Sequence, residues 1–329
     1  MPVKATSKIK LSRAAQVRRY REALPELLPP TADVIFKILF GDERNLDILA
    51  DFLSAVLGFR IAQSAITLLD PHLRRNRPDD KLGILDIKLK LKDGKMVDLE
   101  MQVGNLDSIF KRIEYYISDM TVRQLKKSDK YHKLLPVVGI MVLKDTILPK
   151  TKRFHCEFVM LEKTEHFALH ELRAFHTLEL SKLPEGKSGK LEDWLRFINS
   201  EKREDYMALA QKSKPMKRAL AVLEEASADP RVRDEYVYQL MVEADDMARK
   251  DYYRKKGLEE GIAQGMVQGI AQGMAQGMAQ GMVQGIAQGM AQGRAEGKAE
   301  GKAEGMAEII ALVEKGVPLE EAKRLLGVR

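Results

Sequence analysis

Two short runs of alternating apolar and polar residues occupy positions 85–103, LDIKLKLKDGKMVDLEMQV. The apolar positions are Leu85, Ile87, Leu89 and Leu91 in the first run, and Val97, Leu99, Met101 and Val103 in the second. A period of two with aliphatic residues on one side predicts half-buried β-strands. The Asp93-Gly94 dipeptide between the runs is typical of a β-hairpin, so we expect the two strands to pair.

The two faces of these strands determine how the hairpin pairs. Directly opposed residues in an antiparallel pair share a face, so even-numbered positions must pair with even-numbered ones. A two-residue turn would place Asp86 opposite Met101 and mix polar with apolar side chains. A three-residue loop over 92–94, with Gly94 left-handed in a bulge, restores the match. This register predicts that Asp86 lies opposite Glu100, with Cβ atoms about 5 Å apart.

The predicted pairing brings two carboxyl groups together on the polar face of the hairpin. Opposed carboxylates repel unless one is protonated or a cation lies between them. A hard divalent ion such as Mg²⁺ binds through one or two carboxylates plus waters and phosphates, so Asp86 and Glu100 are candidate ligands. The alternative is a solvated strand face whose lysines neutralise its acids, with Lys88 opposite Asp98. The spacing alone leaves both interpretations open.

Helical periodicity precedes the hairpin. A proline pair interrupts the chain before Thr31, which is expected to cap a helix whose apolar spacing starts at Val34. A second helix is predicted over residues 44–58, where Gly58 favours its end. A short strand is expected over residues 66–70.

After the hairpin the pattern predicts one more helix and then strands. Asp107 is expected to cap a long helix that reaches about Lys127. The continuous apolar run LPVVGIMVL at 135–143 predicts a fully buried central strand. Further strands are expected over 154–160 and 175–180. The order helix, hairpin, helix, strand, strand indicates an α/β sandwich.

Composition and charge add a preference for an anionic partner. At 329 residues the chain is long enough for one sizeable α/β domain with additions. Lys and Arg exceed Asp and Glu by 55 to 48, a formal net charge of +7, which suits a polyanion. The first 21 residues contain basic but no acidic side chains. They form either an arm that contacts a phosphate backbone or an ordinary solvated terminus.

The cysteine content and the hydropathy of the sequence indicate the cellular compartment. Cys156 is the only cysteine, which excludes a disulfide framework and fits a reducing environment. No apolar run approaches the roughly 20 residues of a membrane span, and no signal-peptide core is present, so we expect a cytoplasmic protein with no membrane partner. Four histidines, at 155, 166, 170 and 176, lie near the cysteine, but their spacings fit no common zinc-ligand pattern.

Three motifs carry a resemblance to a known family. Asp86, Glu100 and Gln102 form a D…x-E-x-Q pattern on the hairpin that resembles the active-site signature of the PD-(D/E)XK nuclease superfamily. It is closer to the recombination-promoting nuclease (Rpn-type, transposase-like) branch, in which Gln commonly replaces the signature lysine. The sequence TADVIFKILFG at 31–41 matches the opening motif of that branch, D-x-x-F-K-x-x-F. Arg112, Tyr116 and Gln124 match its R-x-x-x-Y pattern followed by Q, and the similarity covers about residues 30–180.

The resemblance implies a fold and an activity. The fold is an α/β restriction-endonuclease-like core, a mixed central sheet flanked by helices. The activity is a Mg²⁺-dependent DNA endonuclease that hydrolyses phosphodiester bonds, linked to DNA recombination, mobile elements or phage defence. Asp86, Glu100 and the backbone carbonyl of Met101 would hold Mg²⁺, or Mn²⁺ or Ca²⁺ in its place. Gln102 would orient the attacking water, and slow turnover is expected because Gln102 carries no charge.

Supporting roles are implied for four further residues, and two of them have a plain alternative. Asp33 would reach the metal from the first helix, or would simply favour the helix N-terminus through the dipole. Arg112 would stabilise a phosphate or orient Glu100, or would only pack its stem and find a carboxylate. Tyr116 and Gln124 would support the site or contact phosphate.

The remaining chain is helical in pattern and ends in a repeat. We divide the whole chain into five parts: a basic arm (1–29), a nuclease-like domain (30–183), a helical region (190–256), a four-residue glycine repeat tail (257–305) and a C-terminal helical pair (306–329). Thirteen glycines recur at every fourth position of the tail, and each costs a helix about 1 kcal/mol relative to alanine.

The repeat has two interpretations. Ala, Met and Gln favour helix, and small residues spaced by four permit close helix contact, which predicts a self-associating tail and a homo-oligomer. The alternative is a marginal, fraying helix. The corresponding alternative function is a catalytically weak or inactive nuclease-fold module that binds nucleic acid or protein and assembles through its tail.

Overall fold

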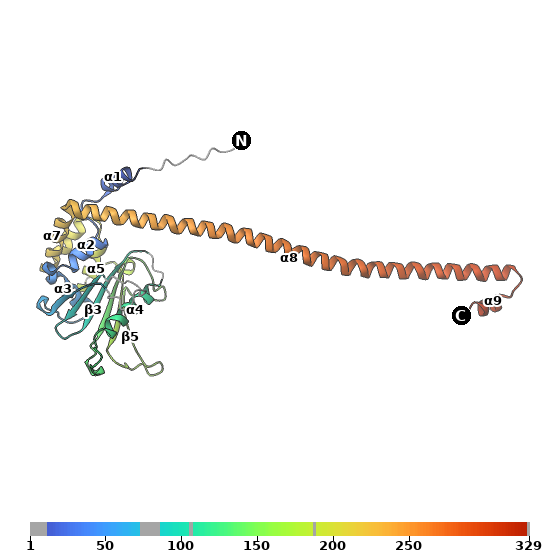
Figure 1. Ribbon diagram of the computed structural model, residues 1–329, viewed down its shortest axis with the longest axis horizontal. Coiled ribbons are helices and arrows are strands. Elements are labelled where there is room, and N and C mark those ends of the chain that lie inside the picture. Colours follow the sequence, from blue (N-terminus) through green and yellow to red (C-terminus); the bar gives the residue numbers. More distant parts are fainter. Residues whose placement is uncertain (1–11, 73–85, 105–107, 187–188, 328–329) are drawn as a thin grey trace. The chain divides into compact units, whose positions relative to one another are not determined.

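A mixed β-sheet forms the centre of the protein. The computed structural model describes residues 12–72, 86–104, 108–186 and 189–327. Within them, six strands form one sheet in the order β1-β2-β3-β4-β6-β5 (Figure 1). The strands are β1 (Ile66–Leu69), β2 (Ile87–Leu91), β3 (Met96–Gln102), β4 (Val137–Leu143), β5 (His155–Val159) and β6 (Arg173–Glu179). β4 pairs in parallel with β3 and β6, and the other pairs are antiparallel. The predicted α/β fold with a mixed central sheet is confirmed.

The β2–β3 hairpin has the register predicted from its two faces. Ile87 lies opposite Leu99 and Lys88 opposite Asp98, so the next pair along the strands is Asp86 and Glu100. Leu91 N donates to Lys95 O at 2.8 Å, and Gly94 N donates to Leu91 O at 2.8 Å, which closes a three-residue loop. Gly94 has φ 89°, in the left-handed region that favours glycine.

Strand β4 is the buried centre of the sheet. All seven of its residues are buried, as predicted for the run at 135–143. A strand covered on both faces needs apolar side chains at every position, which explains why this segment does not alternate. β1, β5 and β6 confirm the other three strand predictions, with β6 beginning two residues earlier than expected.

Helices flank the sheet and continue beyond it. They are α1 (Arg13–Ala23), α2 (Asp33–Phe40), α3 (Leu46–Leu57), α4 (Ile109–Val122), α5 (Lys190–Asn199), α6 (Arg203–Ala210), α7 (Lys214–Ala228), α8 (Pro230–Glu314) and α9 (Leu319–Leu325). Four short 3₁₀ helices are η1 (Glu43–Asn45), η2 (Gln63–Ala65), η3 (Tyr131–Lys133) and η4 (Leu180–Lys182). Gly58 ends α3 with φ 77°, as predicted.

Two helix boundaries differ from the sequence-based expectation. Thr31 does not cap α2, because Ala32 holds the N-cap position without a side-chain hydrogen bond. α4 ends at Val122 and does not reach Lys127. The chain turns there because the side-chain amide of Gln124 binds both backbone groups of Leu135, at 2.9 and 2.8 Å. The expected cap of α4 at position 107 lies outside the described residues.

The two faces of the sheet carry separate hydrophobic clusters. The odd-numbered residues of β2 and β3 pack in one cluster with α2, α3 and α5 to α7, where Phe36, Phe40, Phe52, Trp194 and Phe197 are fully buried. On the other face, α4 packs on β4 through its buried apolar residues. A Cβ at Gly139 of β4 would lie 2.6 Å from Ile117 Cδ1, so this glycine allows α4 to approach the sheet closely.

The C-terminal residues form a second compact unit. The chain divides into units at residues 1–244 and 245–329. α8 contains all thirteen repeat glycines, and a Cβ at any of them would meet no atom within 4 Å. The segment before Gly316 is the end of α8, so of the predicted C-terminal pair only α9 is a separate helix. In the described part of the chain, no helix combines the length and hydrophobicity needed to cross a membrane.

Candidate active site

Two backbone hydrogen bonds lock Asp86 and Glu100 together at the start of β2. Met101 N donates to Asp86 Oδ2 at 2.8 Å, and Asp86 N donates to Glu100 Oε1 at 3.1 Å. Asp86 is half-buried and Glu100 is 4% exposed. Each carboxyl group therefore has one oxygen in a hydrogen bond to backbone and a second oxygen directed elsewhere. The hairpin register places the two groups side by side, as predicted.

A third acid, Asp98, lies on the same face and is more deeply buried. It is 0% exposed, and neither of its carboxyl oxygens has a hydrogen-bond partner within the described residues. It lies opposite Gly139, where α4 approaches the sheet closely. Lys88, its neighbour across the hairpin, forms no ion pair with it among the described residues. The sequence analysis placed Asp98 opposite this lysine but did not include it among the site residues.

Burial makes these three acids hard to ionise together. Burial and then the negative charge of Asp86 raise the pKa of Glu100 to about 8. Burial raises the pKa of Asp86 as well, against the opposing effects of the Met101 N–H and the Lys37 charge. Burial, with the charges of Glu100 and Asp86, raises the pKa of Asp98 well above its usual range. Ionising all three acids would leave more negative charge than their surroundings balance, so a bound cation would favour their ionised forms.

Arg112 of α4 joins Glu100 to Gln102. Its Nη2 atom lies 3.6 Å from Glu100 Oε2 and donates to Gln102 Oε1 at 2.5 Å. Gln102 Nε2 in turn donates to Gly104 O at 2.9 Å. Both ends of the Gln102 amide are therefore bonded within the protein. Tyr116 lies on the same helix, buried near the acids, and burial followed by the charge of Glu100 raises its pKa.

Gln124, the third residue of the pattern formed with Arg112 and Tyr116, has a different position. Its amide is occupied by the backbone of Leu135 at the entrance to β4. This pair of bonds ties the end of α4 to the sheet. The structure thus brings Asp86, Glu100, Gln102 and Arg112 into one connected group and assigns Gln124 contacts away from that group.

Asp33 is connected to the acid pair through a lysine. Lys37 Nζ lies 2.8 Å from Asp33 Oδ1 and 4.0 Å from Asp86 Oδ1. Gln239 Nε2 donates to Asp33 Oδ2 at 3.3 Å. Burial opposes the charge of Lys37, but the hydrogen bond and charge of Asp33 and the charges of Asp86 and Glu100 raise its pKa above the ordinary value. Lys37 therefore stays protonated beside the acid pair.

Lys37 is a second residue that sequence reasoning did not include in the site. The signal was present, because Lys37 stands one helical turn after Asp33 within the D-x-x-F-K-x-x-F motif. What the sequence did not supply was the packing of α2 against the sheet, which brings this turn of helix to the start of β2.

Histidines and cysteine do not assemble a metal centre in the described part of the chain. His155 Nε2 and His176 Nδ1 lie 3.0 Å apart, and burial lowers the pKa of His176 to about 4, so it stays neutral near pH 7. Among the described residues, no three side chains of His, Cys, Asp or Glu are grouped so that they could hold a metal ion. A metal at the acid pair would therefore depend on two carboxylates, backbone oxygen and water.

Comparison with known families agrees with this geometry. The model of the PD-(D/E)XK nuclease family transposases matches residues 30–252, more than half of the chain. The chain therefore belongs to the PD-(D/E)XK nuclease superfamily, and within it to the nuclease family transposases, as the sequence motifs predicted. Membership indicates a nuclease-like or transposase-like function. Comparison with curated proteins and with solved structures found no match.

Proposed function

We propose that the protein is a metal-dependent DNA endonuclease with Asp86 and Glu100 at its active centre. The observation that carries the proposal is the opposed carboxyl pair at the start of β2, locked by two backbone hydrogen bonds while burial raises both pKa values. Acids in a packed interior are costly unless they are paired or bind a metal. Strongly perturbed acids that share a site are typical of functional centres.

The atoms around this pair fit a hard divalent cation. In the β2–β3 ladder the odd-numbered residues are the hydrogen-bonded ones, since Leu91 N donates to Lys95 O and the register continues through Ile87 and Leu99. By that alternation the backbone N–H and carbonyl of Met101 face the β2 side, where the N–H already binds Asp86. Asp86, Glu100 and the Met101 carbonyl together offer oxygen ligands, the type that Mg²⁺, Mn²⁺ and Ca²⁺ prefer. When bound, the ion would supply charge to the scissile phosphate and lower the pKa of a water molecule.

The neighbouring side chains then have distinct tasks. Arg112 holds Glu100 through an ion pair, and Gln102 anchors Arg112. The expected orientation of water by Gln102 would require its amide to exchange one of its present hydrogen bonds. Lys37 supplies a permanent positive charge next to Asp86, and Asp33 positions Lys37. In this assignment Asp33 acts through Lys37 and not as a direct metal ligand.

The wider assignment follows from family and charge. A net charge of +7 favours association with DNA, and the family relationship favours a role in recombination, mobile elements or phage defence in the cytoplasm. Tyr116, buried above the acid cluster, supports the position of Arg112 one turn away on α4.

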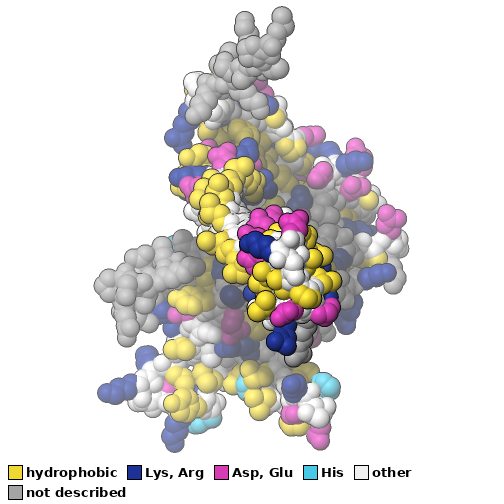
Figure 2. All heavy atoms as spheres, turned by 90° about the vertical axis from the view of Figure 1, so that its right-hand side faces the viewer, with side chains coloured by type: hydrophobic (Ala, Val, Ile, Leu, Met, Phe, Trp, Pro, Cys, Tyr) yellow, Lys and Arg dark blue, Asp and Glu magenta, His cyan; other side chains and the backbone are white. Residues whose placement is uncertain are grey.

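We also propose that the tail mediates assembly with a second copy of the chain. No contact with the described residues of the protomer requires glycine at the repeat positions, since each position would have room for a Cβ. Apolar side chains such as Ile262, Met266 and Met278 are more than half exposed, and Figure 2 shows many apolar groups (yellow) at the surface. Close helix contact through glycine, with burial of these side chains, would offset the low helix propensity of the repeat.

Truncation after Lys256 tests this assembly. The truncated protein should have a lower oligomeric mass in light scattering, while cleavage per active site persists at saturating DNA. An unchanged stoichiometry would show that the tail is a passive extension. An unchanged stoichiometry with lost cleavage would mean that the tail reaches the DNA or the active site, against the proposed domain division.

A second candidate function is a catalytically weak or inactive module that binds nucleic acid. It is favoured by Gln102, which is uncharged and fully engaged with Arg112 and Gly104. Nicking of supercoiled plasmid in Mg²⁺, Mn²⁺ and Ca²⁺ separates the two functions. The endonuclease converts the plasmid to open-circular or linear forms only with a divalent ion. A binding module changes the mobility of the plasmid but leaves its strands intact.

A further inference from the structure

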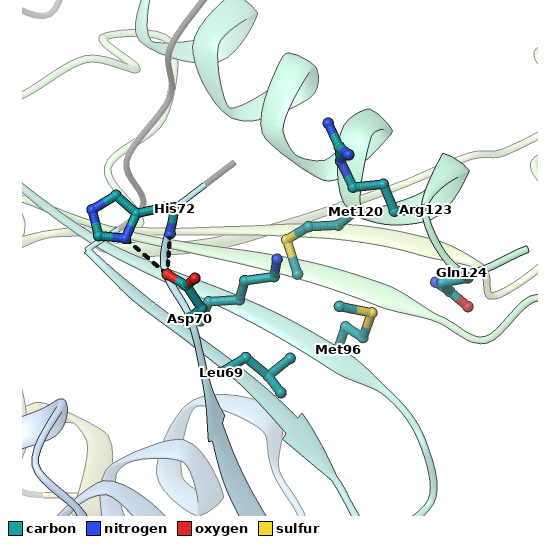
Figure 3. A pocket seen from close by; sticks show the side chains of 8 residues that line it. Leu69, Asp70, His72, Met96, Met120, Arg123 and Gln124 are labelled. Carbon is teal, nitrogen blue, oxygen red and sulfur yellow. Dashed lines mark hydrogen bonds and ion pairs between the residues drawn. The ribbon is translucent and has the colours of Figure 1, made fainter. Parts of the chain in front are cut away.

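A cavity of about 460 Å³ lies beside the acid cluster and has no role in the mechanism above. It is lined by Leu69, Asp70, His72, Lys88, Met96, Met120, Arg123 and Gln124. β1 and its C-terminal end contribute one wall, β2 and β3 the floor, and α4 the opposite wall. Figure 3 shows Asp70 and His72 on one side of the cavity, and Met120 of α4 and Arg123 just after this helix on the other. This volume is in the range of small-ligand sites.

The cavity lies on the same face of the sheet as the acid pair. Lys88 follows Asp86 by two residues on β2, so the two side chains share a face about 7 Å apart along the strand. Lys88 also pairs with Leu69 on β1 and with Asp98 on β3, which places it at the boundary between the acid cluster and the cavity. A ligand that extends from the acid pair along β2 would therefore reach the cavity next.

Among the described residues that line the cavity, every charged side chain except Lys88 has a charged partner. Arg123 Nε lies 2.6 Å from Asp119 Oδ2, and His72 Nδ1 lies 2.8 Å from Asp70 Oδ1. Lys88 is half-buried and forms no hydrogen bond or ion pair with any described residue. Its half-buried side chain has lost part of its hydration, and no hydrogen bond or ion pair to a described residue replaces it. A desolvated cation of this kind gains most from an incoming anion.

We propose that this cavity is a second phosphate subsite, in which Lys88 binds a backbone phosphodiester group that flanks the scissile one. The subsite rests on the proposed nuclease function, since it extends the path of the DNA strand from the acid pair. Arg123 lines the opposite wall and is held in place by Asp119. The apolar side chains of Leu69, Met96 and Met120 in the lining suit the sugar next to the phosphate. A contact of this type positions the strand and carries no sequence information.

Lys88→Met tests the subsite, because methionine keeps the length of the side chain but removes its charge. Binding of a fluorescein-labelled DNA duplex is measured in EDTA over a series of salt concentrations, so that cleavage does not interfere. We expect a Kd about tenfold higher and a salt dependence reduced by about one phosphate contact. Lys88→Arg should retain most of the affinity. Thermal unfolding of each variant checks that the fold is intact.

Lys90→Met is the matched control. Lys90 lies on the same strand and the same face, two residues further from Asp86, but it is exposed and does not line the cavity. Its loss should change the Kd about twofold or less, as expected of a single exposed charge. Equal effects of the two variants would show diffuse electrostatic attraction and would overturn the subsite.

Cleavage kinetics separate the subsite from the proposed nuclease function. With Mg²⁺, Lys88→Met should raise KM and leave kcat nearly unchanged; a lower kcat at unchanged KM would overturn the subsite in favour of a role in the chemistry. If the wild type never cleaves but Lys88→Met still weakens DNA binding selectively, the subsite stands and the nuclease function fails. If inorganic phosphate stabilises the wild type but not Lys88→Met, and the two bind DNA equally, the site serves free phosphate and the proposal is wrong.

Discussion

The β2–β3 hairpin presents two faces that are built from alternate residues of the same strands but have opposite physical properties. On the odd-numbered face, Leu89, Val97 and Leu99 are completely buried in a continuous hydrophobic cluster. On the even-numbered face, Asp98 and Glu100 are almost as deeply buried, yet they are acids. One face removes apolar surface from water and stabilises the fold. The even-numbered face holds carboxyl groups where burial opposes their ionisation.

The difference shows how a small sheet separates stability from chemistry. Because the side-chain period of a strand is two, one residue can face the core while its neighbour faces a reactive site, with no loop between them. The free-energy cost of burying the acids is offset by the burial of apolar side chains on the odd-numbered face. Substitutions on the two faces should therefore have different consequences, and each of the following predictions tests that separation.

The largest effect is expected for Glu100→Gln. The substitution keeps the shape of the side chain and one acceptor oxygen for the Asp86 N–H, but it removes one of the two negative charges available to a metal ion. Plasmid nicking should fall by at least roughly 10²–10³-fold, the loss typical of a group that stabilises charge in a transition state, while DNA binding persists. Glu157→Gln, on exposed β5, is the control and should cleave normally. Wild-type rates for Glu100→Gln would remove this pair from the active centre.

Leu89→Ala tests the apolar face. Leu89 is 0% exposed, and truncation of such a residue leaves a cavity that costs about 2–5 kcal/mol of unfolding free energy. We expect a clearly lower midpoint in chemical denaturation. Below its unfolding temperature the variant should nick plasmid at the wild-type rate per folded molecule. Loss of cleavage in a fully folded variant would show that the two faces are not independent.

The acid cluster also predicts how stability depends on pH when no metal is present. The pKa of Glu100 is about 8 in the folded protein, above its value of 4.5 in the unfolded chain, so the folded state binds more protons between these values. Its contribution to stability is therefore present at low pH and is lost as pH rises towards 8. The neutral His176 acts in the opposite sense, but only up to about pH 6.5, the pKa of an unfolded histidine.

Denaturation of the wild type and Glu100→Gln in EDTA, from pH 6.5 to 8.5, measures this contribution. The wild type should lose stability relative to the variant by about 2 kcal/mol over this range. Subtraction of the two curves removes the contribution of the histidines. Excess Mg²⁺ at pH 8 should restore stability to the wild type more than to the variant, through binding to the folded state. If the wild type instead gains stability relative to Glu100→Gln as pH rises, the buried position of Glu100 is contradicted.

The alternation of side chains was sufficient to predict the hairpin because a register error would have exposed its apolar face. Gly94 added the left-handed residue that the three-residue loop requires, so local sequence and burial agreed. β4 could be predicted for a similar reason, since a strand buried on both faces has no polar positions. In each case, residues close together in the sequence contained the whole pattern.

The features that could not be predicted depend on contacts between distant segments. The end of α4 is determined by the bond between Gln124 and Leu135, which the helical pattern does not contain. Asp98 is buried because α4 approaches the sheet at Gly139, and Lys37 reaches Asp86 because α2 packs beside β2. Strand periodicity places a side chain on a face, but it does not determine what covers that face.

The smallest effect is expected for Gln102→Lys, which adds a positive charge to the polar face. Lysine can donate to Gly104 O as the Gln102 amide does now, so the fold should persist. It cannot accept a hydrogen bond from Arg112, which would then turn fully towards Glu100 Oε2, at present 3.6 Å away. A cation next to the acid pair stabilises negative charge that develops on the phosphate, so cleavage should rise a few-fold.

Gln102→Met is the control for this substitution, because it removes the amide without adding charge. Arg112 then loses its acceptor at Gln102 and gains nothing in return, so cleavage should fall and not rise. Single-turnover rates for both variants, with metal affinity measured by titration, separate the effect of charge from that of position. If Gln102→Lys is folded, binds metal normally and yet does not cleave, the amide is needed as the anchor of Arg112, and the orientation of Glu100 matters more than an added charge.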